Sequence, residues 1–374
     1  MTAPIKEAIN NIKKPSMLKV IVNSIDLLLI VFITFIYYLS LTVETKRVIF
    51  IPKGSTNYII TYLTKNHYNL NILDKITLNN LGYPQSGWID LKSTSMRKFD
   101  FLYKLTTSKA ALVNITLIPG ETYYFFLQQL SKKLKLSQKD LFYKYKLLAY
   151  KKDGNILPQT YTLPIGMNTT DLLQYLFRYT NNQYKKYSLK IFGTWDKQRW
   201  YKYITIASII QKEAASTKEM SIIASVIYNR LKKRMKLQMD GTLNYGPYSH
   251  TTITYKMIRT NNSDYNTYKH KGIPKNPICA VEFEAIKAAI APMKTDYLYF
   301  VKTADGTKHI FSADYKTHMK NIKKIVKRKK LQRKFKKAKQ KRKKAQKKIV
   351  HKTVHKKRTT KKTHSLKNLW KSVY

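Results

Sequence analysis

A long apolar run near the N-terminus constrains the architecture of this chain more than any other feature. Residues 20–43 contain a single charged residue, Asp26, and no charge from Leu27 onward. A helix of about 20 apolar residues is long enough to cross a hydrocarbon core of roughly 30 Å. We therefore expect one transmembrane helix over residues 20–43, preceded by a short segment, residues 1–19, and followed by the folded part of the chain.

The ends of this run leave the nature of the segment open. A cleaved signal peptide would need a shorter apolar region and a small-x-small cleavage site, which does not follow here, so the sequence favours an uncleaved anchor. Asn23 and Asp26 are expected at the headgroup level, and Tyr37 and Tyr38 at the opposite interface. Basic residues flank the run on both sides, so charge predicts its orientation only weakly.

Length and charge narrow the alternatives further. With 374 residues, 43% of them hydrophobic, the chain can form two domains and bury a sizeable core. The net charge is +52, but residues 321–374 hold 25 of the 72 Lys and Arg residues and no Asp or Glu. A surplus of this size predicts attraction to polyanions: nucleic acid, anionic lipid or acidic wall polymers. The single cysteine, Cys279, excludes an intramolecular disulfide.

Residues 323–374 form a basic tail in which apolar residues are too sparse for a core. Repulsion between like charges favours an extended or partly helical segment. In a cytosolic chain such a tail would indicate nucleic-acid binding, which the apolar N-terminal run disfavours. Outside a membrane it would meet anionic wall polymers or lipid headgroups, and a passive solvated tail is the remaining alternative.

Three segments between the apolar run and the middle of the chain share one pattern. Each has a β-prone run, a turn with Pro and Gly, a hydroxyl residue that can cap a helix, and an apolar-periodic helix. They are residues 48–63, 113–134 and 161–179. Their unequal spacing excludes a solenoid. We expect residues 46–188 to form an α/β module with a linking α+β region.

The stretch from Tyr201 to Leu243 carries the candidate chemistry. Ile206, Ile209, Ile210 and Glu213 recur at helical spacing, so one carboxylate lies on an otherwise apolar stripe. Loss of hydration would raise its pKa toward the range that a general acid needs at neutral pH. The alternative is that Glu213 lies at the edge of the stripe and reaches solvent.

Ser216-Thr217-Lys218-Glu219 has the sequence of a capping box and predicts the start of a second helix with a buried face. Beyond it the pattern predicts an α+β domain over residues 189–322. We expect a loop over residues 248–266, a helix over 280–291, and strands over 297–301 and 308–312 around an Asp305-Gly306 turn.

Eight short runs in this region occur in the order of one known family. They are ASIIQKE (207–213), IASV (223–226), NRL (229–231), MKLQMD (235–240), YNTY (265–268), GIP (272–274), PI (277–278) and KTDYLYFV (294–301). Together they closely resemble the endolytic murein transglycosylase, or YceG-like, family over roughly residues 46–322. Any one fragment would be a weak signal, whereas eight in order are specific.

The resemblance implies a single-pass cell inner membrane protein whose catalytic domain lies on the periplasmic or extracytoplasmic side, so that residues 1–19 are cytoplasmic. It implies a lyase that cuts peptidoglycan glycan strands internally between N-acetylmuramic acid and N-acetylglucosamine. Glu213 would protonate the glycosidic oxygen and then deprotonate the muramoyl 6-hydroxyl, leaving 1,6-anhydro ends and limiting strand length. The implied protein partners are enzymes of cell-wall synthesis, and no cofactor is needed.

The same resemblance implies that residues 46–188 contain a LysM-like module, and a scaffold without glycan contact is the alternative. One departure is visible, because Leu157-Pro158-Gln159-Thr160-Tyr161 has glutamine where the family usually has aspartate. Candidate substrate-binding side chains lie in the motifs that accompany Glu213. They are Asn229, Gln238, Asp240, Tyr265, Asn266, Tyr268 and His309. Each could instead have a structural role, as a turn, cap or sheet residue.

Other functions stay open on the sequence alone. Ordinary glycosidases need two carboxylates, and Asp240 or Asp296 keeps hydrolysis formally possible. A non-catalytic, membrane-anchored murein-binding scaffold is the alternative from a different class, against which the Glu213 motif argues. We expect no metal site, since the histidines lack ligand spacing and neither HExxH nor CxxC occurs.

Overall fold

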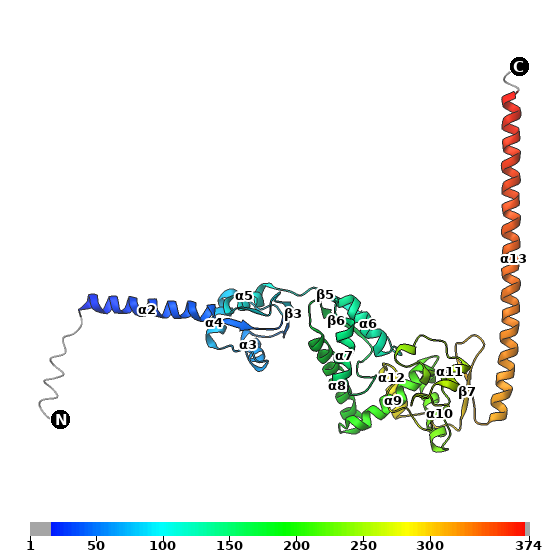
Figure 1. Ribbon diagram of the computed structural model, residues 1–374, viewed down its shortest axis with the longest axis horizontal. Helices are drawn as coiled ribbons and strands as arrows, with labels where there is room; N and C mark the ends of the chain where they lie inside the picture. The colour runs from blue at the N-terminus through cyan, green and yellow to red at the C-terminus, as the bar shows by residue number, and fades with distance from the viewer. Residues whose placement is uncertain (1–15, 371–374) are drawn as a thin grey trace. The chain divides into compact units, whose positions relative to one another are not determined.

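The computed structural model describes residues 16–370, and within its last helix the side chains of residue 341 and residues 344–370 are left undescribed (Figure 1). The expected segment 1–19 therefore lies almost wholly outside the described residues. Contacts divide the chain into two compact units. The first comprises residues up to 117 together with 126–148 and 159–179; the second comprises 118–125, 149–158 and everything from 180 onward.

The first unit begins with helix α2 (Met17–Ser40), which Ser16 caps by accepting a hydrogen bond from the Lys19 N–H. Among the described residues it is the one helix that is long and apolar enough to cross a membrane. It starts three residues before the expected run and ends before Thr42, which belongs to strand β1 (Thr42–Glu44). Residues 42–43 are not helical, because β1 pairs with strand β4 (Ser95–Arg97).

A small α/β core follows α2 in the first unit. Strand β2 (Val48–Ile51) pairs antiparallel with β3 (Gly87–Asp90), with Val48 opposite Asp90 and Ile51 opposite Gly87. Helices α3 (Thr56–Lys65), α4 (Ile72–Leu81) and α5 (Lys98–Thr107) belong to the same part of the unit. Their buried faces meet in one core, which includes Leu39, Ile51, Ile59, Leu63, Leu78, Ile89, Phe101 and Leu102.

The C-terminal end of α2 is fixed to this core by buried polar groups. The Tyr38 hydroxyl donates to Asp74 Oδ2 over 2.7 Å, and Lys98 Nζ donates to the Tyr38 oxygen over 2.8 Å. Lys98 and Asp74 are both buried, and their charged atoms lie 3.6 Å apart. Burial of this acid and base is tolerated because their opposite charges lie close together and both bond the Tyr38 hydroxyl. The last turn of α2 is thus part of the folded unit.

The rest of the first unit contains a third two-stranded sheet and three helices. Strand β5 (Leu112–Thr116) pairs antiparallel with β6 (Thr160–Pro164), with Thr116 opposite Thr160. The helices are α6 (Tyr123–Leu134), α7 (Gln138–Leu148) and α8 (Thr169–Phe192). The boundary between the units falls inside α6 and α8. The strand–turn–helix pattern is confirmed as β2–α3, β5–α6 and β6–α8, although α8 continues well beyond residue 179.

The second unit is built around helix α9 (Lys197–Glu213), whose N-cap Asp196 accepts from the Arg199 N–H. It packs with α10 (Met220–Lys232) and α12 (Phe283–Ile290). Strands β7 (Tyr299–Lys302) and β8 (His309–Ser312) form the expected hairpin, with Gly306 in its turn at φ 78°. The 3₁₀ turns η2 (Asp240–Leu243) and η3 (Gly246–Tyr248) connect α10 to the region that follows.

Two expectations for the second unit are wrong in detail. The segment 248–266, expected as a loop, contains helix α11 (Tyr255–Thr260), because Thr254 caps it by accepting from the Met257 N–H. The helix expected over 280–291 begins at Phe283, since the Ala280 N–H bonds to the Glu121 carbonyl instead of continuing a helix.

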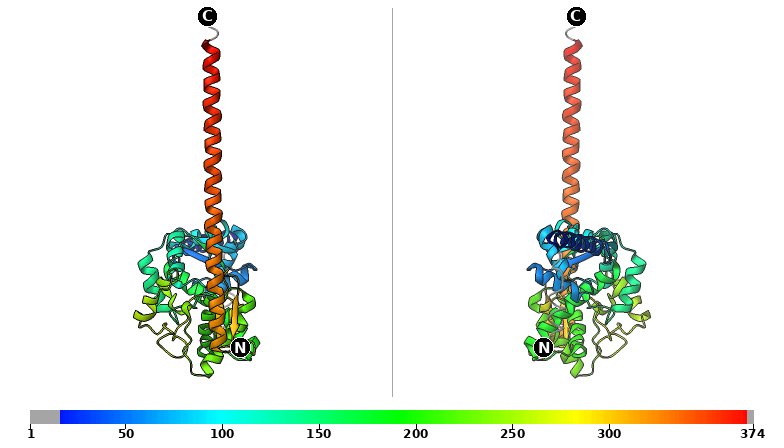
Figure 2. Two further views of the ribbon diagram at one scale, coloured as in Figure 1. Left: turned by 90° about the vertical axis from the view of Figure 1, so that its right-hand side faces the viewer. Right: turned by 90° about the vertical axis from the view of Figure 1, so that its left-hand side faces the viewer.

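The C-terminal region forms one helix, α13 (Tyr315–Trp370), which runs without interruption in both views of Figure 2. Of the two expected conformations for the tail, extended or helical, the described part is helical. The helix starts eight residues before residue 323, so its first turns belong to the hairpin region of the second unit.

Candidate active site

The end of α9 positions Glu213. Ile206, Ile209 and Ile210 are buried, as the periodicity predicts, and Glu213 is the last helical residue. Its carboxylate Oε1 accepts a hydrogen bond from the Gly241 N–H over 2.8 Å. A Cβ atom on Gly241 would lie 2.7 Å from Lys212 Cβ and 2.9 Å from Glu213 Oε1. A glycine at 241 is therefore needed for the backbone to approach the carboxylate this closely.

The surroundings of Glu213 favour its protonated form. Burial raises the pKa of Glu213 to about 7, and the negative charge of Asp240 adds to the rise. The Gly241 N–H and the positive charge of Lys302 act in the opposite direction and stabilise the carboxylate. A carboxyl group with a pKa near 7 holds a proton in much of the population at neutral pH and releases it readily, which is the property of a general acid and base.

Glu213 lines a pocket of about 330 Å³ within the second unit. The walls come from α9, α10, η2 and the segment before it, the segment that contains Tyr268, the hairpin and the first turns of α13. The lining residues are Glu213, Arg230, Leu237, Gln238, Met239, Asp240, Tyr268, Tyr299, Phe300, Tyr315 and His318. Three of the seven predicted substrate-binding residues, Gln238, Asp240 and Tyr268, therefore lie beside Glu213.

Asp240 and Tyr268 form a polar pair at this pocket. The Tyr268 hydroxyl donates to Asp240 Oδ1 over 2.6 Å. Burial, helped by this hydrogen bond, raises the pKa of Tyr268, so the phenol remains a donor at neutral pH. The pair presents a carboxylate and a phenol that can exchange hydrogen bonds with hydroxyl groups of a ligand.

Arg230 forms the buried floor beside this pair. Its Nε donates to the Leu298 carbonyl over 2.6 Å and Nη1 to the Leu237 carbonyl over 2.8 Å, which ties α10 to the hairpin and to the segment before η2. The guanidinium also lies 5.1 Å from the centre of the Tyr299 ring. Gln238, which accepts from Arg230 at 3.4 Å, has φ 51°, an uncommon conformation for a residue other than glycine.

The other four predicted residues lie outside the pocket lining. Asn229 donates to the Thr295 and Tyr297 carbonyls over 2.7 and 3.0 Å. Asn266 is fully buried and donates to the Ile258 and Asn261 carbonyls. Tyr265 is buried against Tyr245, with ring centres 4.0 Å apart. The two asparagine amides hold backbone segments in place, and Tyr265 packs against another ring.

The fourth of these residues, His309, is the partner of Glu219, which the sequence predicted to be part of a capping box before α10. Ser216 makes no side-chain cap, so the predicted capping box is wrong. The Glu219 carboxylate instead accepts from the His309 backbone N–H over 2.7 Å and lies 2.9 Å from His309 Nδ1. A long-range partner on the hairpin has replaced the local one, since both side chains are almost fully buried there.

The aromatic wall of the pocket was not predicted as part of the site. His318 stacks on Tyr299 with ring centres 5.1 Å apart, and its Nδ1 is buried without a hydrogen-bond partner. The alternation of Tyr297, Tyr299 and Val301 in a strand is a signal that Tyr299 shares a face with Val301, but the sequence does not say which face meets Glu213. No group of three His, Cys, Asp or Glu residues that could hold a metal ion occurs among the described residues.

The chain is similar to several known proteins. An endolytic murein transglycosylase of Bacillus subtilis (strain 168) is 34% identical over 179 residues, which is 47% of this chain and 49% of the relative. One from Streptococcus pneumoniae serotype 2 (strain D39 / NCTC 7466) is 28% identical over 185 residues, 48% of this chain and 33% of the relative. The chain thus spans half or less of the length of these curated relatives.

A solved structure of a YceG-like protein from Listeria monocytogenes is similar over 75% of this chain and 98% of that chain, with 27% identity and a TM-score of 0.48. Residues 49–324 match the sequence model of the YceG-like family. This match covers well over half of the chain, and the chain therefore belongs to the YceG-like family.

Proposed function

We propose that this protein is an endolytic murein lytic transglycosylase, in which Glu213 is the single catalytic acid and base. The observation that carries the proposal is the position of Glu213 in a pocket, with a pKa raised to about 7 by burial and a single backbone donor on its carboxylate. The names of the curated relatives support the same reaction class.

The reaction needs one proton carrier and no water. The protonated Glu213 donates its proton to the glycosidic oxygen between N-acetylmuramic acid and N-acetylglucosamine, and the C1–oxygen bond breaks as positive charge develops on the muramoyl ring. The Glu213 carboxylate then takes the proton of the muramoyl 6-hydroxyl, whose oxygen bonds to C1. The products are a 1,6-anhydro end and a free hydroxyl on N-acetylglucosamine, and Glu213 is protonated again.

Other groups in the pocket suit a sugar polymer. Tyr299 and Phe300 offer apolar ring surfaces, while Asp240, Tyr268 and Gln238 offer donors and acceptors for hydroxyl and acetamido groups. We assign these five side chains to substrate binding. For Asn229, Tyr265, Asn266 and His309 we propose a supporting role, because they contact backbone carbonyls or other side chains of this protein outside the pocket lining.

Hydrolysis is a second candidate, since Asp240 lies in the same pocket as Glu213 and could activate a water molecule. Digestion of purified glycan strands in oxygen-18 water separates the two reactions. Transglycosylation predicts anhydro ends without oxygen-18; hydrolysis predicts reducing ends that carry it. Intact strands bound without cleavage would instead support the non-catalytic scaffold.

We also propose that α2 anchors the protein in the membrane as a single span with the two units on the extracytoplasmic side. The length and composition of α2 support the span, and the proposed murein substrate supports the orientation. Protease added to intact spheroplasts should reduce the chain to a small anchor fragment. Protection of residues 50–370 while the membrane is sealed would contradict this orientation.

A further inference from the structure

Beyond its first turns, helix α13 is exposed as far as its side chains are described. Ile325 is the last buried residue among those described side chains, and every side chain from Val326 to Gln340 is exposed. An isolated helix is stable only when neighbouring side chains support it, and lysines three or four positions apart repel one another. An anion along this helix would remove that repulsion.

The charge density of this stretch is high enough to favour a polymer over single anions. Residues 323–343 contain 14 Lys or Arg residues and no Asp or Glu. With a rise of 1.5 Å per residue, one positive charge falls on about every 2.3 Å of the helix axis. The phosphate spacing of nucleic acid is comparable, roughly 1.7 Å for the duplex and 3.4 Å for one strand. A helix of this charge density concentrates counterions around itself. Binding of a polyanion releases those counterions, and their release is entropically favourable.

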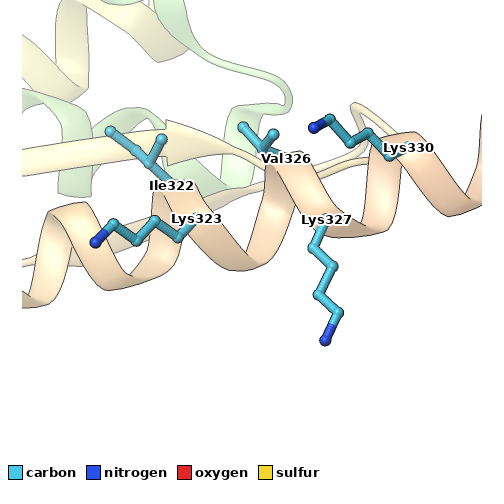
Figure 3. Close-up of a pocket in the computed structure, with 5 residues that line it drawn as sticks. All are labelled: Ile322, Lys323, Val326, Lys327 and Lys330. Carbon is cyan, nitrogen blue, oxygen red and sulfur yellow. The ribbon is translucent and has the colours of Figure 1, made fainter.

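A shallow basic pocket of about 340 Å³ lies on α13, within residues 322–330. It is lined by Ile322, Lys323, Val326, Lys327 and Lys330. Figure 3 shows the side chains of Lys323 and Lys330 extending to the left and that of Lys327 extending downward. Lysines continue at spacings of three and four residues, at 334 and 337, so that one side of the helix carries a basic row.

The apolar residues argue against a bilayer surface as the partner. A helix that lies in a membrane interface needs an apolar face along its length. Val326 and Phe335 are nine positions apart and so lie on opposite sides of α13. Single-stranded nucleic acid is also disfavoured, because Phe335 is the one aromatic residue within 323–343 on which a base could stack.

We propose that α13 binds a linear phosphate polymer, with the row that begins at Lys323, Lys327 and Lys330 as its contact surface. Recognition is by charge along an extended chain and needs no sugar or base readout. This inference does not depend on the chemistry of Glu213.

Titration of the full chain, held in zwitterionic nanodiscs, with fluorescent long-chain inorganic polyphosphate tests the proposal. With six or more phosphate contacts, affinity should fall by about 10³-fold between roughly 50 and 200 mM salt. Replacing Lys323, Lys327 and Lys330 by Gln should lower the slope of log affinity against log salt by about two, since each lost contact removes roughly 0.7.

The matched control replaces Lys185, Lys186 and Lys190, exposed on α8, by Gln and should leave the slope unchanged. Equal losses in the two triple variants would overturn the proposal, because net charge alone would then explain binding. Tighter binding to oligothymidylate of equal phosphate number would also overturn the proposal. The same holds for tighter binding to phosphatidylglycerol vesicles, if Phe335→Ser abolishes that binding. Glu213→Gln should bind polyphosphate as wild type does, so this result and the proposed chemistry can fail separately.

Discussion

Glu213 and Glu219 lie six residues apart, at the end of α9 and just before α10, yet their surroundings drive their pKa values in opposite directions. Burial acts on both carboxylates and disfavours their charged forms. Glu213 has one backbone donor, and burial raises its pKa to about 7. At Glu219 burial is outweighed by the side chain and backbone N–H of His309, which lower its pKa.

The difference shows that burial alone does not set the direction in which the pKa of a carboxylate shifts. What matters is how many donors satisfy the carboxylate. Glu219 is bonded on both oxygens by a strand of the hairpin and holds that hairpin against α10. Glu213 has one backbone donor and lines a pocket, which is why we propose it as the acid and base.

The largest expected effect is on the rate of glycan cleavage in Glu213→Gln. The amide keeps the size of the side chain and can accept the Gly241 N–H, but it cannot transfer a proton. The rate should fall by about 10²- to 10⁴-fold, the usual range for general acid–base catalysis. Counting anhydro ends by mass spectrometry measures the loss.

Gln211→Ala is the matched control on the same helix. Gln211 exchanges hydrogen bonds with Glu282 at the start of α12, so its loss should affect stability more than rate. A rate in Glu213→Gln within a few-fold of wild type would remove Glu213 from the mechanism.

The second effect concerns the close approach of Gly241. In Gly241→Ala the new methyl group would overlap Glu213 Oε1 and Lys212 Cβ, so the carboxylate must move. A displacement of about 1 Å can reduce a rate by roughly 10²-fold. Gly193→Ala is the control, because Gly193 has φ 69° with no atom near its Cβ position and should lose stability rather than rate. Equal rate losses in both variants would mean that Gly241 acts only through folding.

How far the sequence predicts this site depends on the range of each interaction. Ile206, Ile209 and Ile210 were predicted to be buried with Glu213 beside them, because helical periodicity is local. The capping box failed because Glu219 has a partner 90 positions away. Neither residue spacing nor helix propensity predicts a contact over this distance. Glu219 bonds His309 on the buried hairpin instead of capping its own helix.

The fold shows the same division. The three strand–turn–helix segments and the hairpin were predicted, since turns with Pro and Gly and alternating strands are local signals. The pairing of β1 with β4, and of Tyr38 with Asp74 and Lys98, joins residues far apart in the chain. The aromatic wall of Tyr299 and His318 also needed the three-dimensional fold, because the two residues come from different elements.

The third prediction concerns stability at Glu219. Glu219→Ala leaves the buried His309 N–H and ring without their acceptor, which costs about 1–3 kcal/mol. The melting temperature of the full chain in neutral detergent should fall accordingly, while cleavage by the folded fraction changes much less than in Glu213→Gln. If the melting temperature is unchanged and the rate is lost, the roles of the two glutamates are reversed.

The smallest effect is the pH dependence of stability. The folded-state pKa of Glu213, about 7, exceeds its ordinary value of 4.5, so its contribution is fully present below pH 4.5 and is lost as the pH rises through 7. Glu219 has a lowered pKa, so its contribution is present above 4.5 and is lost as the pH falls through the folded-state value. The melting temperature of Glu213→Gln, relative to that of wild type, should therefore rise as the pH rises. The melting temperature of Glu219→Ala, relative to that of wild type, should rise as the pH falls. Parallel pH profiles for both variants would contradict the comparison.

The protonation of Glu213 itself is the most direct test of the mechanism. Protein labelled with carbon-13 at the glutamate carboxyl carbons can be titrated by NMR, and the Glu213 signal is the one missing from Glu213→Gln. We expect that signal to titrate at about pH 7 and the cleavage rate to fall above the same pH, because the acid must carry its proton when the glycosidic bond breaks. A Glu213 signal that titrates near the ordinary value of 4.5, with a cleavage rate that does not change around pH 7, would contradict the assignment of Glu213 as the general acid.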